Sequence, residues 1–313
     1  MQVVIELLVM VFQVLLEYFK SFCRLFYRGK PKSIEGQVVL VTGAGSGLGR
    51  LLSLKLAIKG AKIIGWDINE DGLKETQNLV AALFEDTAET AKNDRFTYAI
   101  VDITDRHQVY AEAEKIGKAV DILINNAGIV TKNSFLCEKD DIGIVKTFEV
   151  NVISHFWTVK SFLPKMMEQN RGHIVTIASV AGFGGSPRLT DYSASKFAAI
   201  GFHESLVFEL RGQGFKDTIF GTLVCPYVVD TGMFQGTSKN KMDFLMPILK
   251  PEYVVSKIEE GILYNYSNVI IPKLCSTFAT AKFLTTAEGW AAIVEGMGGH
   301  NLFKDLVGRK KEK

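Results

Sequence analysis

The sequence predicts an α/β fold, a doubly wound parallel sheet with helices on both faces, built as one domain behind an N-terminal membrane-binding helix. Three observations predict this fold. Residues 37–42 form a short apolar, β-branched run that is typical of a buried parallel strand. A glycine-rich turn at 43–49 follows and leads into a helical pattern. Further short apolar runs recur at 61–66, 173–178 and 219–225.

The composition is that of a globular protein and disfavours some classes of function. The chain has 313 residues, of which 47% are hydrophobic, with 36 basic and 34 acidic side chains. A net charge of +2 creates no field that gathers polyanions, and no basic run interleaved with aromatic residues occurs in the body of the chain. We therefore expect no nucleic-acid partner. The length suits one α/β domain or two small ones, and no internal boundary is visible.

The four cysteines are Cys23, Cys137, Cys225 and Cys275, which lie far apart and form no C-x-x-C pair. This spacing predicts neither a zinc site nor a disulfide framework, so we expect no metal. Reduced thiols are typical of proteins that face the cytosol.

An apolar segment near the N-terminus predicts membrane attachment. Residues 7–16 are apolar except for Gln13, but a full span needs about 20 such residues. The segment therefore either crosses the membrane with Glu17 inside it or lies in the interface. A soluble helix packed on the protein's own core is the alternative, and Glu6 ahead of the run disfavours a cleaved signal peptide. Aromatic residues suited to headgroup depth follow: Tyr18, Phe19, Phe22, Phe26 and Tyr27.

Basic residues at both ends of the chain bear on its location. A cluster after the apolar segment favours the cytosolic side of a membrane, so the body of the chain should face the cytosol. This cluster consists of Lys20, Arg24, Arg28, Lys30 and Lys32. Residues 310–313, Lys-Lys-Glu-Lys, resemble the dilysine retrieval signal of endoplasmic-reticulum membrane proteins. We expect the endoplasmic reticulum membrane, a lipid droplet, or both.

The glycine-rich turn predicts a phosphate-binding site. Gly43, Gly45, Gly47 and Gly49 stand between a predicted strand and a predicted helix. Without side chains, backbone N–H groups can approach a pyrophosphate closely, and the helix dipole adds a favourable potential. A glycine-rich turn alone is usually a flexible loop, but strand, glycines, helix and second strand in succession favour a dinucleotide site.

Asp67 follows the second predicted strand, near the position that binds the adenosine ribose. A carboxylate at this position accepts hydrogen bonds from both ribose hydroxyls and repels a 2′-phosphate. We therefore predict NAD as the cofactor, while the nearby cation of Arg50 leaves NADP open.

Tyr192 and Lys196 lie one helical turn apart and therefore on the same helix face. A tyrosine that exchanges a proton near neutral pH needs help, because the reference pKa of its phenol is about 10. The nearby ammonium should favour the phenolate. The same spacing recurs at Tyr253 and Lys257, so the spacing alone is not specific.

The presence of Ser179 distinguishes the first tyrosine–lysine pair from the second. Ser179 stands at the end of the predicted strand 173–178, where its hydroxyl can donate to a carbonyl or alkoxide oxygen. Asn240 takes the corresponding place before the second pair, with no strand leading into it. We predict that the second pair belongs to an ordinary helix that starts after Pro251.

These motifs together resemble the short-chain dehydrogenase/reductase family. The resemblance covers residues 36–272 and includes Thr42-Gly43-x-x-x-Gly47-x-Gly49, Asn125-Asn126-Ala127-Gly128 and Tyr192-x-x-x-Lys196. It implies a Rossmann-like fold with the catalytic residues Asn151, Ser179, Tyr192 and Lys196. The cofactor-binding residues that it implies are Gly43, Ser46, Gly47, Leu48, Gly49, Asp67, Asp102, Ile103, Asn125, Ala127, Gly128, Tyr192, Lys196, Pro226, Val229 and Thr231.

The resemblance also implies roles and boundaries. Lys196 would bond the nicotinamide ribose, Asn151 would hold a helix distortion and a water that leads to the lysine, and Thr231 would reach the carboxamide. Tyr227 stands where the family usually has glycine, which adds bulk near the substrate. We expect a membrane anchor and basic linker at 1–35, a catalytic domain at 36–272 and a C-terminal extension at 273–313.

The best local matches are to the membrane-associated retinol and 17β-hydroxysteroid dehydrogenases of the type 11 and 13 kind. They imply a homodimeric oxidoreductase that transfers a hydride between NAD and a lipophilic alcohol: a retinoid, a steroid or a long-chain lipid alcohol. The Met-rich apolar segment 232–249 and Phe183 should cover that substrate, unless they only seal the core or touch the membrane. Two other functions stay open: a lipid-droplet or membrane interaction protein on a dinucleotide scaffold, and an NADP-dependent carbonyl reductase.

Overall fold

The computed structural model describes residues 1–23, 27, 29–84, 95–117, 120–131, 134–237, 243–244, 246–304 and 306. The chain divides into two units, Met1–Ser33 and Ile34–Lys313. The predictions made for Arg24, Phe26, Arg28 and the basic C-terminal residues 310–313 lie outside the described residues. Residues 238–242 and 245 of the predicted substrate cover do so as well.

In the first unit, the described residues form the helix α1 (Gln2–Cys23). It is longer than the predicted apolar run, because Tyr18 and Phe19 continue the helix beyond Leu16. Residues Gln2–Lys20 are long and apolar enough to cross a membrane by length and composition. The large apolar side chains described on this helix are exposed to solvent. The helix α1 therefore presents an apolar surface of the kind that contacts a membrane or another protein.

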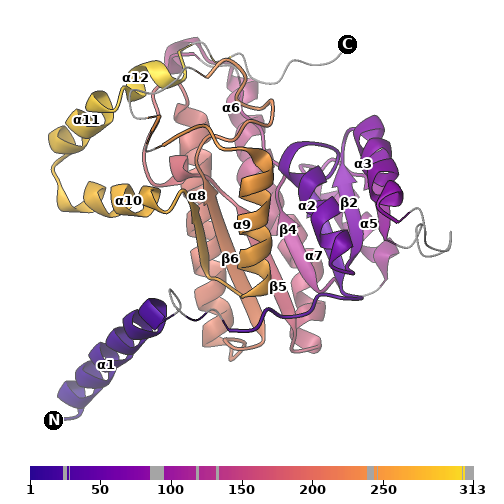
Figure 1. Ribbon diagram of the computed structural model, residues 1–313, viewed down its shortest axis with the longest axis horizontal. Helices are drawn as coiled ribbons and strands as arrows, with labels where there is room; N and C mark the ends of the chain where they lie inside the picture. The colour runs from indigo at the N-terminus through magenta and orange to yellow at the C-terminus, as the bar shows by residue number, and fades with distance from the viewer. Residues whose placement is uncertain are drawn as a thin grey trace. The chain divides into compact units, whose positions relative to one another are not determined.

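The second unit is built on a seven-stranded sheet in the order β3-β2-β1-β4-β5-β6-β7 (Figure 1). Every neighbouring pair of strands is parallel. This confirms the predicted fold class, with strand bounds that differ from the predicted runs by about one residue. The strands are β1 (Val38–Thr42), β2 (Lys62–Asp67), β3 (Phe96–Ile100), β4 (Ile122–Asn125), β5 (Gly172–Ile177), β6 (Ile219–Pro226) and β7 (Asn268–Ile271).

Helices cover both faces of the sheet because alternate strand residues point to opposite sides. Val39 and Val41 pack into one core with α2 (Gly47–Ile58), α3 (Glu70–Ala82) and α9 (Pro251–Leu263). Val38 and Leu40 pack into the other with α5 (Arg106–Ile116), α7 (Ser154–Glu168) and α8 (Thr190–Gly212). Strands buried on both faces explain the continuous apolar runs in the sequence.

The remaining described elements lie near the carboxyl ends of the strands or follow the last strand in the sequence. Figure 1 shows the last three helices, in yellow, to one side of the sheet. These elements are η1 (Leu136–Glu138), α6 (Asp141–Phe148), the π-helical turn η2 (Glu149–Ile153), η3 (Val180–Gly182), α10 (Leu274–Leu284), α11 (Ala287–Gly296) and α12 (Gly299–Leu302).

The strand order reverses between β1 and β4, which places a ligand site outside the carboxyl ends of these strands. Thr42, Asn125 and Pro226 are the last residues of β1, β4 and β6, and Ser179 follows β5 by two residues. The fold therefore brings together, at one edge of the sheet, most of the positions that the sequence motifs single out.

Candidate active site

The turn after β1 has a backbone conformation and close contacts that disfavour larger side chains at its glycine positions. Gly43 has a φ of +71°, and its N–H donates to the carbonyl of Trp66 over 2.7 Å. A Cβ on Gly49 would collide with the Gly43 carbonyl, which sits against the start of α2. Gly47 has a φ of +54°, and a Cβ there would lie 3.5 Å from Cβ of Thr231. The turn therefore requires glycine for strand-to-helix packing and for its left-handed backbone.

This turn fits the pyrophosphate of a dinucleotide. Ser46 precedes the first turn of the 12-residue helix α2, and its side chain makes no capping hydrogen bond to that turn. The first N–H groups of a helix are unpaired within the helix and attract anions. Gly47 lies beside Thr231, so the structure brings together two predicted cofactor-binding positions that are far apart in the sequence.

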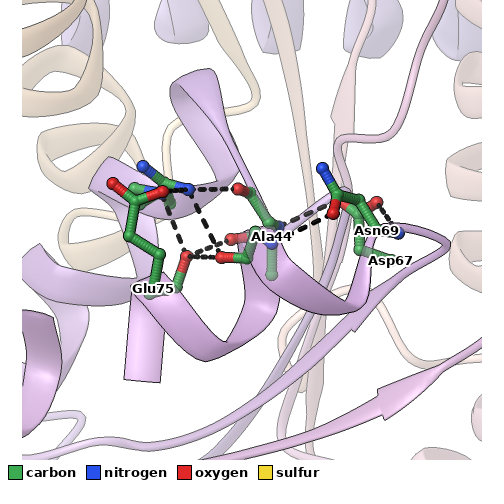
Figure 2. A network of polar contacts seen from close by, with 8 residues as sticks. Ala44, Asp67, Asn69 and Glu75 are labelled. Carbon is green, nitrogen blue, oxygen red and sulfur yellow. Dashed lines mark hydrogen bonds and ion pairs between the residues drawn. The ribbon is translucent and has the colours of Figure 1, made fainter. Parts of the chain in front are cut away.

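Asp67 is fixed beside the glycine turn by two backbone hydrogen bonds. Its Oδ2 accepts from the Gly45 N–H over 2.9 Å, and its Oδ1 accepts from the Asn69 N–H over 3.0 Å. Figure 2 shows Asp67 and Asn69 on one side of Ala44 and Glu75 on the other. The carboxylate therefore sits at the end of β2, as the sequence predicts for a group that faces the adenosine ribose.

Arg50, the cation that left NADP open, is bound within the same network. Its Nη2 donates to the Gly45 carbonyl over 2.6 Å and pairs with Oε2 of Glu75 over 2.7 Å. Its Nε donates to Oγ1 of Thr76 over 3.1 Å. These contacts hold the guanidinium between α2 and α3, with Glu75 partly offsetting its charge.

The two asparagines at the end of β4 make contacts in different places, which the sequence does not reveal. Oδ1 of Asn125 accepts from Thr158 of α7 over 2.8 Å, so this side chain points into the protein. Asn126 instead faces the glycine turn, where its Nδ2 donates to the Thr42 carbonyl over 2.8 Å. Oγ1 of Thr42 in turn accepts from the N–H groups of Asn126 and Ala127. Thr42 and Asn126 are thus site residues that the prediction missed.

Asp102 follows β3 and is held by polar contacts of its own. Oδ1 accepts from the Thr104 N–H over 2.9 Å and from its hydroxyl over 2.6 Å, and Lys146 lies 3.4 Å from Oδ2. Burial raises the pKa of Asp102, but the hydrogen bonds from Thr104 and the charge of Lys146 outweigh it and leave the pKa below its usual value. Ile103 beside it is buried.

Tyr192 and Ser179 meet at the carboxyl end of β5. Tyr192 is 4% exposed, and it lines the same cavity as Ser179. Burial raises the pKa of Tyr192 to about 12, although the neighbouring Ser179 hydroxyl opposes that shift. This differs from the sequence expectation that Lys196 lowers the phenol pKa, because desolvation of the phenolate is the larger effect in this enclosed position.

Lys196 lies one turn after Tyr192 on α8, with its ammonium 5.7 Å from the centre of the tyrosine ring. Nζ donates to the Ile177 carbonyl over 2.9 Å. A Cβ on Gly128 would lie 3.6 Å from Nζ, so the lysine also reaches the loop after β4. Burial lowers the pKa of Lys196 to about 8.

Asn151 lies in the π-helical turn η2 between α6 and α7, at the position where the resemblance implies a helix distortion. The side chain is fully buried. Its Oδ1 accepts from the Ile129 N–H over 2.8 Å, and its Nδ2 donates to the Ile129 carbonyl over 3.0 Å. Nδ2 also donates to Oγ of Ser195, which bonds the Tyr192 carbonyl over 2.7 Å. Asn151 thus connects the loop after β4 to the helix that carries Tyr192 and Lys196.

The segment after β6 borders the same site. Oγ of Ser179 donates to the Pro226 carbonyl over a long 3.4 Å. Val229 is buried and pairs with Leu249, and its carbonyl accepts from the Thr231 N–H over 2.9 Å. Tyr227, the departure from the family pattern, packs at the edge of two core clusters and lines the neighbouring cavity.

A cavity of about 130 Å³ is lined in part by Ser179 and Tyr192. Phe183, Phe234 and Met246 line it, and these residues come from the segments expected to cover a substrate. The sequence does not reveal that the C-terminal helices also line this cavity. The residues that those helices and their connections contribute are Cys275, Phe278, Ala279, Trp290, Val294, Met297, Gly299, Leu302 and Phe303.

The second tyrosine–lysine pair lies elsewhere. Tyr253 and Lys257 belong to α9, which begins at Pro251, and the side chain of Tyr253 is half exposed. Lys257 pairs with Glu260 of the same helix over 2.8 Å. This confirms the prediction of an ordinary helix start and leaves a matched control in the chain.

Comparison with known proteins places this geometry in a family. The sequence profile of the short chain dehydrogenase family matches residues 37–242. Retinol dehydrogenase 10 from Homo sapiens is 38% identical over 333 aligned positions, which cover 100% of this chain and 97% of that protein. Short-chain dehydrogenase/reductase family 16C member 6 from Bos taurus is 42% identical over 285 positions, covering 90% of this chain and 87% of that protein.

Solved structures agree with the sequence comparison. A short-chain dehydrogenase/reductase from Burkholderia phymatum, in complex with NAD, matches with a TM-score of 0.68 and 27% identity, covering 81% of this chain and 95% of that one. The strand order, the glycine turn and the buried serine–tyrosine–lysine cluster agree with this likeness. The chain belongs to the short-chain dehydrogenase/reductase family and is an NAD(P)-dependent alcohol oxidoreductase.

Proposed function

We propose that this oxidoreductase acts on a lipophilic alcohol or carbonyl with NAD as its cofactor. The observation that carries the proposal is the cavity beside Ser179 and Tyr192. Most of the residues that line it are apolar, and Ser179 and Tyr192 supply hydroxyl-bearing side chains to the same lining. Such a site binds an apolar body and orients a single oxygen. Retinoids, steroids and long-chain lipid alcohols have this form.

In the proposed reaction, Tyr192 acts as its phenolate, the form that the ammonium of Lys196 favours, and accepts the hydroxyl proton of the alcohol during oxidation. During reduction the phenol donates that proton to the substrate oxygen. Ser179 donates a hydrogen bond to the substrate oxygen and stabilises the charge that develops on it. Lys196 relays the proton outward through its ammonium. When bound, the nicotinamide supplies the hydride acceptor or donor. Asn151 fixes the position of the loop after β4 relative to α8 through its hydrogen bonds to Ile129 and Ser195.

The contacts of Asp67 and Arg50 support NAD over NADP. Asp67 would receive the ribose hydroxyls, and its negative charge would repel a 2′-phosphate. Arg50, which would bind that phosphate, is held by Gly45, Thr76 and Glu75. Turning it toward a phosphate would break an ion pair and several hydrogen bonds.

We also propose that α1 attaches the enzyme to the endoplasmic reticulum membrane or to a lipid droplet, with the catalytic domain in the cytosol. The apolar exposed surface of α1 supports attachment. A homodimer formed through α7 and α8 is part of the same proposal. Phe156 of α7 and Phe208 of α8 are 45% and 71% exposed, which gives those helices an apolar surface that a second copy could cover.

The test is turnover by the purified full-length chain in detergent micelles. Retinol, a hydroxysteroid and a long-chain fatty alcohol would be offered with NAD and, separately, with NADP, and reduced cofactor would be followed by absorbance. The proposal expects turnover of at least one of these alcohols and a higher kcat/KM with NAD. Cofactor binding without turnover of any of them would instead support the interaction-protein function, and a preference for NADP would support the carbonyl reductase.

A further inference from the structure

A buried ion pair lies directly beside Tyr192. Nζ of Lys139 is 2.8 Å from Oδ1 of Asp191, and the two side chains are 3% and 1% exposed. Asp191 is the residue before Tyr192, in the first turn of α8. Ion pairs this deeply buried are weak evidence for stability, since desolvation of both charges offsets their attraction. The pair therefore calls for another explanation.

The carboxylate of Asp191 is bound by two side chains from another part of the chain. Lys139, 2.8 Å from Oδ1, and the hydroxyl of Thr131, 2.5 Å from Oδ2, approach from the segment between β4 and α6. Burial raises the pKa of Asp191, but these hydrogen bonds outweigh it, so its pKa lies below the usual value and the group is ionised at neutral pH.

The two segments joined at Asp191 also meet at other points. The guanidinium of Arg188 lies 4.5 Å above the ring of Phe135. Leu189, in the residues leading into α8, packs in one cluster with Tyr192 and Val130. The loop that Asn151 holds at Ile129 is thus tied a second time, a few residues later, to the start of the helix that carries the tyrosine.

We propose that Asp191 is a positioning residue for Tyr192: its carboxylate, neutralised by Lys139 and bonded by Thr131, holds the first turn of α8 so that the phenol lies beside Ser179. The inference rests on the proposed role of Tyr192 as proton acceptor. A shift of the tyrosine by about 1 Å is enough to lower turnover by about 100-fold, because proton transfer depends steeply on the positions of the reacting atoms.

Two double variants separate positioning from stability. Lys139→Met/Asp191→Asn and Lys139→Met/Asp191→Leu both remove the ion pair and leave no unpaired buried charge. Asn can still accept a hydrogen bond from the Thr131 hydroxyl, whereas Leu cannot. We expect the Leu variant to show a kcat at least about tenfold below that of the Asn variant. Similar thermal midpoints and similar NADH affinities, the latter followed by fluorescence, establish that both variants are folded.

The panel also contains two controls. Lys115→Met breaks the exposed pair of Lys115 with Glu112 on α5 and should leave kcat at the parental value. Tyr192→Phe tests the proposed function itself, and the inference requires this variant to be inactive. Equal kcat values for the Asn and Leu variants, alongside an inactive Tyr192→Phe, would overturn the positioning role alone. A fully active Tyr192→Phe would overturn the proposed function and the inference with it.

Discussion

The side chain of Asn151 satisfies both backbone polar groups of Ile129. It accepts the N–H over 2.8 Å and donates to the carbonyl over 3.0 Å. An asparagine amide is suited to this because it carries one acceptor and one donor group. The loop after β4 is thereby held against the π-helical turn η2, and through Ser195 against α8.

Asn151→Ala should therefore affect both stability and catalysis. The substitution leaves the part-buried N–H and carbonyl of Ile129 without their Asn151 partner, and the loss of the two hydrogen bonds should cost about 1 kcal/mol each. We expect a lower unfolding free energy in urea and a reduced kcat. An alanine variant with unchanged stability and kcat would show that the clamp on Ile129 is not needed.

Asp67→Ser should change the cofactor preference. Serine keeps a hydrogen-bond acceptor near the Gly45 N–H but removes the charge that repels a 2′-phosphate. We expect the ratio of kcat/KM for NAD to that for NADP to fall by at least about tenfold, equivalent to about 1.4 kcal/mol. Measuring both ratios in one preparation cancels differences in the active fraction. A ratio that stays at the parental value would contradict the assignment of Asp67.

Trp290→Ala tests the C-terminal wall of the cavity. The Trp290 ring lies against Gly184, where an added Cβ would be 3.2 Å from Cζ2. Shortening this side chain enlarges the cavity that Trp290 lines, so kcat/KM should shift toward longer or bulkier alcohols, by about tenfold between the best and the shortest substrate. Trp157→Phe on α7, a tryptophan outside the cavity lining, serves as the control. Identical substrate profiles for parent and Trp290→Ala would place the substrate elsewhere.

Acid should weaken the fold through buried histidines. Burial lowers the pKa of His203 to about 4 and that of His155 to about 3. Between pH 6.5 and these values, the unfolded chain binds protons that the folded chain does not, so stability falls as the pH falls. For His203 the loss from pH 7 to pH 5 is about 2 kcal/mol.

His203→Gln isolates this contribution. Glutamine can still bond Oγ1 of Thr176, the partner of the His203 ring over 2.9 Å, but it does not titrate. Unfolding in urea at pH 7 and pH 5 should show a smaller difference in free energy for the variant than for the parent. Equal differences would mean that His203 does not remain neutral in the folded protein.

Sequence motifs predict local parts of this site well. The glycine turn, Asp67 and the pair Tyr192 and Lys196 depend on contacts between neighbouring residues or within one helical turn, and such spacing is visible in the sequence. The fold class is also visible in the sequence, because strands that are buried on both faces produce continuous apolar runs. The position of Ser179 could be predicted because the apolar run of β5 ends just before it in the sequence.

Other parts depend on contacts that spacing does not encode. Which of Asn125 and Asn126 faces the glycine turn is decided by the direction of the backbone after β4. The cavity wall combines Phe183 with Trp290, more than a hundred positions later in the sequence. The pKa of Tyr192 depends on how completely the phenol is enclosed, and burial raises it to about 12 even though the Lys196 ammonium lies 5.7 Å from the ring centre.

The most direct test of the account compares two tyrosine-to-phenylalanine substitutions. Tyr192→Phe removes the hydroxyl beside Ser179, and Tyr253→Phe removes the hydroxyl of the equally spaced second pair. Turnover of the best lipophilic alcohol should fall at least about 100-fold in the first variant, with NADH affinity unchanged, and should stay at the parental rate in the second. Parental turnover by Tyr192→Phe would contradict the account.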